Sequence, residues 1–339
     1  MPKVGLVLGA GGIVGHAFHA GVLRALAEAT GWDPRTAELI VGTSAGAYAG
    51  AQLRAGLSAA DLAARVAGQP VSTDGLPIYH HLGWADAVDG PRLRSLRMAS
   101  PRLALRCVAR PWQVGKLAAG VLPRGRVSLE EHAARMRAFF NGGWAARPLW
   151  LCTLRLDDGS RVVFGRAGAP ATDVGSAVAA SCAIPGWFCP VRIAGRWHVD
   201  GGAHSPSNLD LLAGEDLDLV VAISPMSAAP GAWRAAVDLP ARKSFSLLLR
   251  EEARRVRRRG TPVAAFEPTG RDLEVMGLNA MNPRHRVPVV ASARDSTLRR
   301  LERPEWRERL AALTAPAPLV PAAPTAPTAP GRRPDRLLQ

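Results

Sequence analysis

Ser44 is the first residue of this sequence whose surroundings could support nucleophilic chemistry. It lies in Gly42-Thr43-Ser44-Ala45-Gly46, which fits G-x-S-x-G between an apolar run and a stretch of helical periodicity. In a nucleophile elbow the glycines allow a sharp strand-to-helix turn, and the helix start supplies free N–H groups beside the serine. The other interpretation is a tight turn in which Ser44 only caps the helix.

A glycine-rich loop, Gly9-Ala10-Gly11-Gly12-Ile13-Val14-Gly15, follows the first apolar run of the chain. The backbone N–H groups of such a loop can bind an anion. A dinucleotide site is disfavoured, because G-x-G-x-x-G starting at Gly9 would need glycine where Val14 stands. If the two glycine-rich turns end neighbouring parallel strands, the loop can reach an acyl oxygen attacked by Ser44.

A base is also needed, since a serine hydroxyl is a poor nucleophile unaided. Asp200-Gly201-Gly202 follows Val191–Val199 and is expected at the end of a strand, although Asp-Gly is also a common turn dipeptide. His198 and His204 flank Asp200, and either could complete a triad. Otherwise the Asp200 carboxylate takes the proton itself, which requires desolvation and hydrogen-bond contact with the serine.

The elements that must position these residues alternate as in a parallel sheet flanked by helices. Lys3–Leu8 and Glu38–Val41 predict buried strands, each followed by a helix, at Gly15–Ala29 and Ala45–Ala55. Residues 58–140 are expected to be mostly helical. Further strands are predicted at Leu149–Leu154, Arg161–Phe164, Val191–Ile193 and Leu217–Ile223, with a helix at Asp173–Ser181 and a hairpin across Asp157-Asp158-Gly159. The fold class is therefore α/β with a mostly parallel central sheet.

Composition limits the class of protein. The chain has 339 residues, 47% of them hydrophobic, which is enough for a sizeable core. Its four cysteines show neither metal-site nor disulfide spacing, so we expect a cytoplasmic protein with no metal and no cofactor. No apolar run is long enough to span a membrane, and the short run Val4–Leu8 fits a buried strand better than a signal peptide.

The net charge of +15 attracts polyanions, either nucleic acid or anionic lipid. Nucleic acid is disfavoured, because aromatic residues are 5% of the chain and no binding motif is present. Ala241–Arg259 predicts a basic amphipathic helix. Its arginines could contact an anionic membrane peripherally, or could be a solvated face above a packed one. The Pro- and Ala-rich residues 313–339 are expected to be a disordered tail behind one domain, 1–312, with a motif-bearing core at 1–225 and a helical part at 226–312.

In this order the three motifs resemble those of the patatin-like phospholipase family, and Ala180-Ser181-Cys182-Ala183-Ile184-Pro185 resembles its A-S-x-A-x-P segment. The chain most resembles the small bacterial single-domain members. The resemblance implies a three-layer fold and a catalytic dyad, Ser44 and Asp200, without histidine. The dyad would cleave lipid or other acyl esters through an acyl-enzyme. Backbone N–H groups of Gly11, Gly12, Ile13 and Ala45 would form the oxyanion hole.

The sequence departs from the family pattern at Val14, where the loop usually carries Arg or Lys. The oxyanion donors are backbone groups, so their chemistry survives this change, whereas support for an acidic headgroup does not. An alternative function follows: a catalytically weak or inactive patatin-like protein that binds membranes or a partner. A general α/β-hydrolase is disfavoured, since its elbow serine normally follows several strands and Ser44 follows the second.

Overall fold

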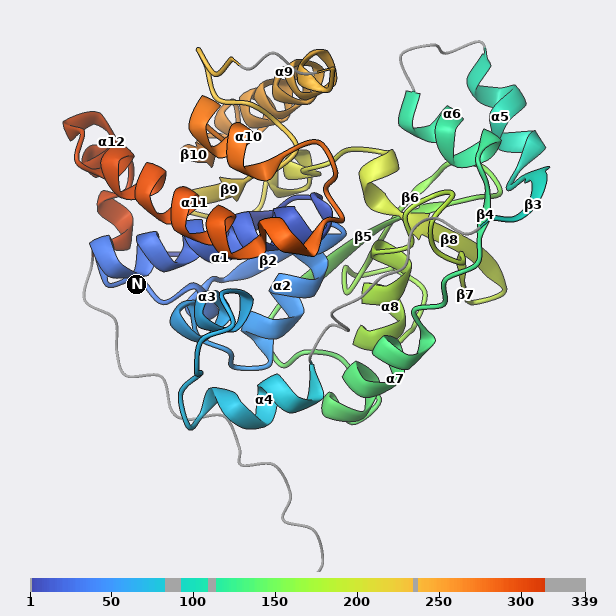
Figure 1. Cartoon of the computed structure of the whole chain (residues 1–339), viewed down its shortest axis with the longest axis horizontal. Coiled ribbons are helices and arrows are strands. Elements are labelled where there is room, and N and C mark those ends of the chain that lie inside the picture. Colours follow the sequence, from blue (N-terminus) through green and yellow to red (C-terminus); the bar gives the residue numbers. More distant parts are fainter. Residues whose placement is uncertain (1, 83–92, 109–113, 234–236, 315–339) are drawn as a thin grey trace, which may run out of the picture.

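The computed structural model describes residues 2–82, 93–108, 114–233 and 237–314 (Figure 1). Its core is an eight-stranded sheet in the order β10-β9-β1-β2-β5-β8-β7, with β6 paired to β5. The predicted α/β fold, a mostly parallel sheet flanked by helices, is confirmed. All but the first two residues of the predicted tail, 313–339, lie outside the described residues.

The sheet has a parallel part and an antiparallel part. Five neighbouring strands run parallel: β1 (Val4–Leu8), β2 (Leu39–Gly42), β5 (Leu149–Arg155), β9 (Leu219–Ile223) and β10 (Val263–Phe266). Three strands complete the sheet in antiparallel pairs: β6 (Arg161–Phe164), β7 (Val191–Ile193) and β8 (Arg196–Asp200). A small second sheet pairs β3 (Leu93–Met98) with β4 (Pro123–Gly125).

Twelve α-helices are present in the described residues. They are α1 (Gly12–Thr30), α2 (Ala45–Arg54), α3 (Ala59–Val66), α4 (Gly75–His81), α5 (Pro101–Val108), α6 (Val114–Val121), α7 (Glu130–Phe139), α8 (Val174–Ser181), α9 (Leu239–Arg257), α10 (Gly270–Met276), α11 (Arg286–Leu301) and α12 (Pro304–Arg309). No described helix combines the length and the apolar character needed to cross a membrane.

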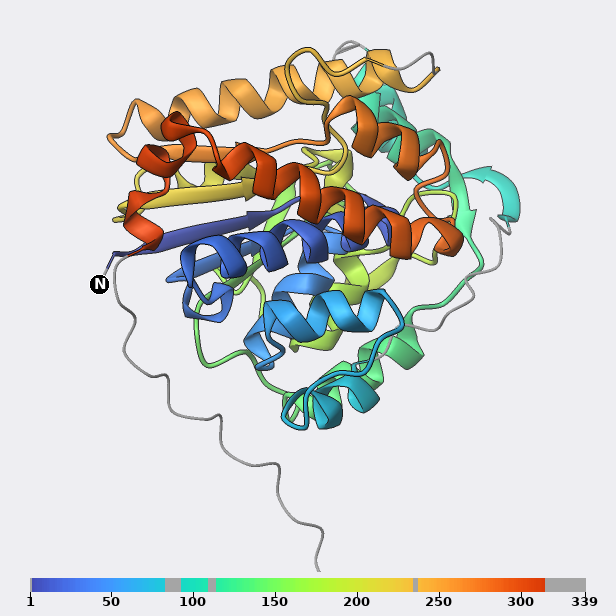
Figure 2. The ribbon, with the colours of Figure 1, turned by 60° about the vertical axis from the view of Figure 1, so that its left-hand side comes forward.

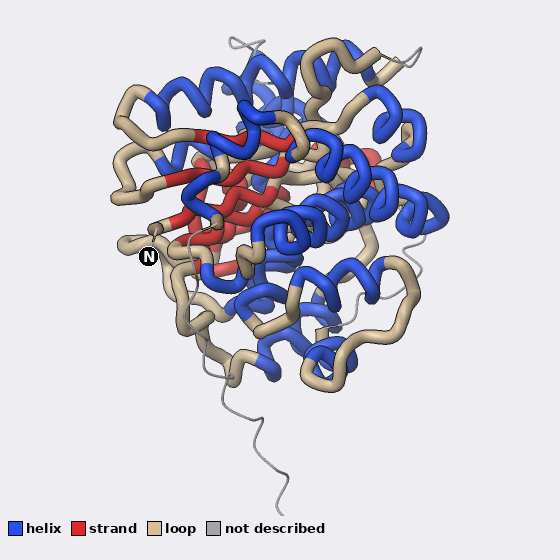
Figure 3. Tube along the Cα trace, turned by 90° about the vertical axis from the view of Figure 1, so that its left-hand side faces the viewer, coloured by secondary structure: helices blue, strands red, loops and turns tan. Residues whose placement is uncertain are grey.

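Side-chain alternation along the strands makes three layers. On β1, Leu6 and Leu8 enter a core shared with α1, α2, α3, α8 and α11, whereas Val7 enters a second core beneath α9. The sheet therefore separates α9 from α1, as Figure 2 shows. Figure 3 shows the strands enclosed between helices. Because both faces are buried, the parallel strands are almost continuously apolar.

The predicted strand Val191–Ile193 is confirmed as β7, and Asp200 ends a second strand, β8, which follows it directly. The chain reverses at Ala194 and Gly195, which have φ of 48° and 77°, so two antiparallel strands form, β7 and β8. β8 also runs antiparallel to β5, and Asp200 pairs with Thr153. The predicted hairpin of β5 with β6 is confirmed. β10 was missed, because Val-Ala-Ala-Phe carries little strand signal, and β3 and β4 lie in the region expected to be mostly helical.

The start of α2 contacts β1 so closely that only glycine fits at position 46. A Cβ atom on Gly46 would lie 1.9 Å from the carbonyl oxygen of Leu8. We predict that Gly46→Ala lowers the free energy of unfolding in urea by about 3 kcal/mol or more, because backbone must move to make room. Gly143→Ala is the control, since its Cβ would lie 3.5 Å from the nearest backbone oxygen. Equal unfolding free energies for the two variants would contradict this packing.

Candidate active site

Ser44 occupies a strained turn between β2 and α2. Its backbone has φ 55° and ψ −119°, a conformation that residues other than glycine rarely adopt. Although Ser44 holds the N-cap position of α2, its side chain makes no capping hydrogen bond. The interpretation of Ser44 as an ordinary helix cap is therefore not supported, and the geometry is that of a nucleophile elbow.

Two residues at the end of α8 hold the backbone of Ser44 in this turn. The Ser44 N–H donates to the Ser181 hydroxyl oxygen at 2.9 Å, and the Ser181 hydroxyl donates to the Cys152 carbonyl at 2.7 Å. The Cys182 thiol lies 3.3 Å from the Ser44 carbonyl oxygen. The A-S-x-A-x-P segment thus binds both backbone polar groups of the elbow. The sequence marked this segment only as a motif and gave no signal of its contacts.

Asp200 lies beside Ser44 at the end of β8. The Ser44 side chain adjoins the Asp200 carboxylate and favours its ionised form, and the Gly202 N–H donates to Asp200 Oδ1 at 2.7 Å. The residue is 5% exposed. Burial raises the pKa of the Asp200 carboxyl to about 6 from an ordinary 3.8, and the Ser44 side chain and the Gly202 N–H oppose that rise. The structure therefore brings together a serine hydroxyl and a carboxylate suited to accept its proton.

Neither histidine near Asp200 takes part in this contact. His198 Nδ1 lies 3.1 Å from the Thr153 hydroxyl, and its ring packs against Phe164. Burial lowers the pKa of His198 and of His204 to about 4, so both are neutral near pH 7. In the described part of the chain no hydrogen bond joins either imidazole to Ser44 or Asp200. The arrangement is a pair of residues, not a triad.

The loop after β1 presents unpaired backbone donors next to the elbow. Leu8 pairs with Gly42, so the loop and the elbow leave the sheet at neighbouring positions. Among the described residues, the N–H groups of Gly11, Gly12 and Ile13 donate to no protein acceptor, and neither does that of Ala45. The Val14 N–H, in contrast, donates to the Ala280 carbonyl at 2.9 Å. The donors left open are those that the family resemblance assigns to the oxyanion hole.

Val14 itself is a core residue. Its side chain is buried in the apolar cluster on the α1 side of the sheet. His16, an ionisable residue two positions further along the chain, contacts the Gln52 side-chain oxygen through Nε2 at 2.8 Å. Burial lowers the pKa of His16 to about 3, so it is neutral and does not replace the missing cation.

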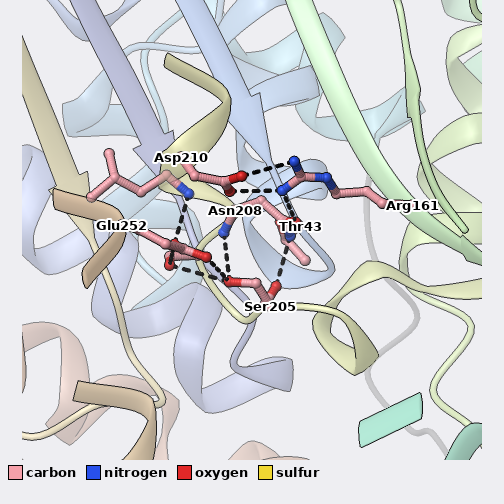
Figure 4. A network of polar contacts seen from close by, with 8 residues as sticks. Thr43, Arg161, Ser205, Asn208, Asp210 and Glu252 are labelled. Carbon is pink, nitrogen blue, oxygen red and sulfur yellow. Dashed lines mark hydrogen bonds and ion pairs between the residues drawn. The ribbon is translucent and has the colours of Figure 1, made fainter. Parts of the chain in front are cut away.

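A buried polar network anchors the residue before Ser44 (Figure 4). The Asn208 side-chain amide donates to the Thr43 hydroxyl at 3.0 Å and to the Ser205 carbonyl at 2.6 Å. Arg161 donates to the Asn208 side-chain oxygen and forms a two-point ion pair with Asp210 at 2.7 and 2.8 Å. The network ties the chain after Asp200 to the elbow and to β6.

Glu252 extends the network to α9. It accepts hydrogen bonds from the hydroxyls of Ser205 and Ser207 and from the Leu209 N–H. Burial raises the pKa of this carboxyl, although these three bonds favour its charged form.

The described residues contain no group of three or more His, Cys, Asp or Glu side chains that could hold a metal ion.

Comparison with known proteins bears on the family. Residues 124–213 match the protein-family model described as patatin-like phospholipase, which agrees with the resemblance noted in the sequence. The match includes Ser181 and Asp200, and Ser44 precedes it. Uncharacterized NTE family proteins of Mycobacterium bovis and Mycobacterium tuberculosis are each 27% identical over 223 residues, which is 66% of this chain and 49% of theirs. The chain thus spans about half the length of these curated relatives.

Matches among solved structures include the following two proteins. VipD from Legionella pneumophila superposes with a TM-score of 0.41 at 16% identity, covering 89% of this chain and 67% of VipD. The type III effector protein ExoU superposes with a TM-score of 0.38 at 19% identity, covering 89% of this chain and 53% of ExoU.

Ser181→Ala tests the support of the elbow. The change leaves the buried Ser44 N–H and Cys152 carbonyl without their partner, so we predict a loss of about 1–3 kcal/mol in unfolding free energy. It should also lower kcat for a soluble ester about tenfold or more with little change in KM, because the nucleophile is no longer held in place. Ser244→Ala, on the exposed face of α9, is the control. Unchanged stability and kcat in Ser181→Ala would exclude this role.

Proposed function

We propose that this patatin-like chain is a serine acyl hydrolase that cleaves lipid ester bonds through a Ser44–Asp200 dyad. The observation that supports the proposal most directly is the position of the Ser44 side chain, at a strained strand-to-helix turn next to the buried Asp200 carboxylate. The family match supports an ester of a lipid as the substrate class.

The reaction proceeds in two halves. Ser44 Oγ attacks the ester carbonyl carbon while Asp200 takes the hydroxyl proton, and a tetrahedral oxyanion forms. The intermediate collapses when Asp200 gives that proton to the leaving alcohol, which leaves an acyl group on Ser44. Water then attacks the acyl carbon, with Asp200 accepting its proton. Collapse returns the proton to Ser44 Oγ and releases the carboxylic acid.

Backbone donors supply the electrostatic part of catalysis. The open N–H groups of Gly11, Gly12, Ile13 and Ala45 stabilise the oxyanion, and each such donor typically lowers the barrier by about 3–4 kcal/mol. Backbone donors do not depend on the side chain at position 14. The buried Val14 therefore alters the surroundings of a headgroup more than the chemistry at the ester carbon.

The alternative function, an inactive patatin-like protein that serves as a peripheral binding module, is motivated by Val14 in place of a cation. It makes a different prediction for a fluorophosphonate probe. An active dyad gives covalent labelling of Ser44, and a vestigial site gives none. The probe therefore separates the two functions without knowledge of the natural substrate.

We predict that Ser44→Ala and Asp200→Asn each abolish hydrolysis of a short-chain p-nitrophenyl ester while the protein stays folded. Ser44→Ala removes the nucleophilic hydroxyl. Asp200→Asn removes the only base that contacts the Ser44 side chain in the described residues. His198→Gln and His204→Gln are the matched controls and should retain activity. Full activity of Ser44→Ala would rule out the mechanism, and loss of activity in a histidine variant with activity retained in Asp200→Asn would restore a triad.

The pH dependence of kcat/KM for the same ester tests Asp200 as the base. Asp200 must be ionised to accept the proton, so activity should fall as pH drops through about 6, the raised pKa of its carboxyl. A rate that is flat from about pH 5 to about pH 8 would exclude a base of this pKa.

Stability gives a second measurement on Asp200 that needs no substrate. The folded pKa, about 6, lies above the ordinary 3.8, so folding is favoured when the carboxyl is protonated and this contribution is lost as pH rises through about 6. Asp200→Asn, which carries no charge, should therefore raise Tm more at pH 8 than at pH 4.

A further inference from the structure

The hairpin of helices α5 and α6 has one face packed on the sheet. On α5 this face consists of Leu103, Ala104 and Cys107; Leu103 and Cys107 share a core cluster with Leu154 of β5 and Val199 of β8. The two helices cross closely, since a Cβ on Gly120 would lie 2.7 Å from the Ala104 nitrogen. Figure 1 shows the pair at the edge of the molecule, beside β4. The inner side of the hairpin is therefore packed against the sheet, and its other side faces away from the core.

The outer face of this hairpin is apolar and exposed. Leu105 and Val108 on α5 are 75% and 67% exposed, and Val114 on α6 is 67% exposed. Val121 and Leu122, at the end of α6, are exposed as well. A cluster of large apolar side chains in water is unfavourable unless another surface covers it, so this face is suited to binding.

The segment that contains the hairpin is strongly basic. Between Asp89 and Glu130 the sequence has nine Arg or Lys residues and no Asp or Glu, against a net charge of +15 for the whole chain. Among them, Arg97, Arg102, Arg106 and Arg126 are exposed. The arginines of α5 flank its exposed leucine, so cations and apolar groups share one face.

The hairpin also adjoins the proposed dyad. A Cβ on Gly115 of α6 would lie 2.5 Å from the Ala203 carbonyl oxygen. Ala203 ends the short helical turn Gly201–Ala203 that directly follows Asp200. Whatever binds the hairpin is therefore held next to the candidate active site.

We propose that the outer face of the α5–α6 hairpin docks the protein on an anionic lipid bilayer. Exposed apolar side chains enter the boundary between headgroups and acyl chains, while the flanking arginines bind the lipid phosphates. A second copy of the chain is a poor occupant, because a contact between two such faces would bring cations against cations. Nucleic acid would match the arginines and leave the apolar side chains uncovered. This inference goes beyond hydrolysis and does not require Ser44 to be reactive.

The basic helix that the sequence singled out, α9, is a weaker candidate. Its predicted apolar face is confirmed at Leu249, Ala253 and Val256, which are buried. On its exposed side, however, Glu251 pairs with three arginines, Arg254, Arg255 and Arg258, at 3.4 to 3.7 Å. Glu251 thus partly neutralises the exposed side of α9, whereas the segment between Asp89 and Glu130 contains no acidic residue.

Vesicle sedimentation tests the proposal, with Ser44→Ala as the background so that no lipid is consumed. The vesicles are phosphatidylcholine alone or phosphatidylcholine with about a third phosphatidylglycerol. We expect binding to the anionic vesicles only, and a loss of about tenfold or more with either Leu105→Gln or the pair Arg102→Gln and Arg106→Gln. The matched controls lie on α9: Leu247→Gln, at a leucine 63% exposed, and the pair Arg254→Gln and Arg258→Gln. These should bind as the background protein does.

Three results would overturn the proposal. The first is unchanged binding of vesicles by both hairpin variants, and the second is an equal loss of binding in the α9 controls. The third is displacement of the vesicles by duplex DNA that binds the same arginines. Because all positions changed are exposed, the variants should keep the unfolding temperature of the parent. Introduced into the Ser44 protein, the hairpin substitutions should leave hydrolysis of the soluble ester unchanged. If the dyad proposal fails, the vesicle result is unaffected. If vesicle binding fails, the test of the dyad with the soluble ester is likewise unaffected.

Discussion

The backbone conformation of Ser44 is the constraint on which the rest of the site depends. A serine at φ 55° is unfavourable by itself and persists only because neighbouring groups hold it. Ser181 and Cys182 bind its N–H and carbonyl, and the lack of a side chain at Gly46 lets α2 start against β1. The free energy that holds the turn therefore comes from distant parts of the chain, and the backbone that carries the Ser44 hydroxyl is positioned without any ligand.

The carboxylate reaches this turn from the opposite direction. Ser44 leaves a parallel strand, whereas Asp200 ends a strand antiparallel to its neighbour, and the pairing of Asp200 with Thr153 sets its height along the sheet. A single reversal at Ala194-Gly195 produces this arrangement. Burial at the junction raises the pKa of Asp200, so the same packing that positions this carboxylate also sets its pKa.

The features predicted well from sequence are local ones. The glycines around Ser44 and those of the loop at Gly11 and Gly12 indicate the turns directly. The apolar runs indicate the parallel strands. The direction of β8 was not predictable, because an Ala-Gly turn is a weak hairpin signal and alternation looks alike in both directions. The roles of Ser181 and Asn208 were not predictable either, since each contacts a residue more than a hundred positions away and single polar residues carry no period.

The network through Glu252 has a consequence for any attempt to find a minimal fragment. The motif-bearing core, residues 1–225, contains every candidate catalytic group, yet it is not self-sufficient. Cutting the chain there would leave the hydroxyls of Ser205 and Ser207 without their buried carboxylate, strip β10 from the edge of β9 and uncover the α1 surface that α11 covers. The motifs thus mark the candidate site, and the elements that follow them supply packing and hydrogen bonds on which that site depends.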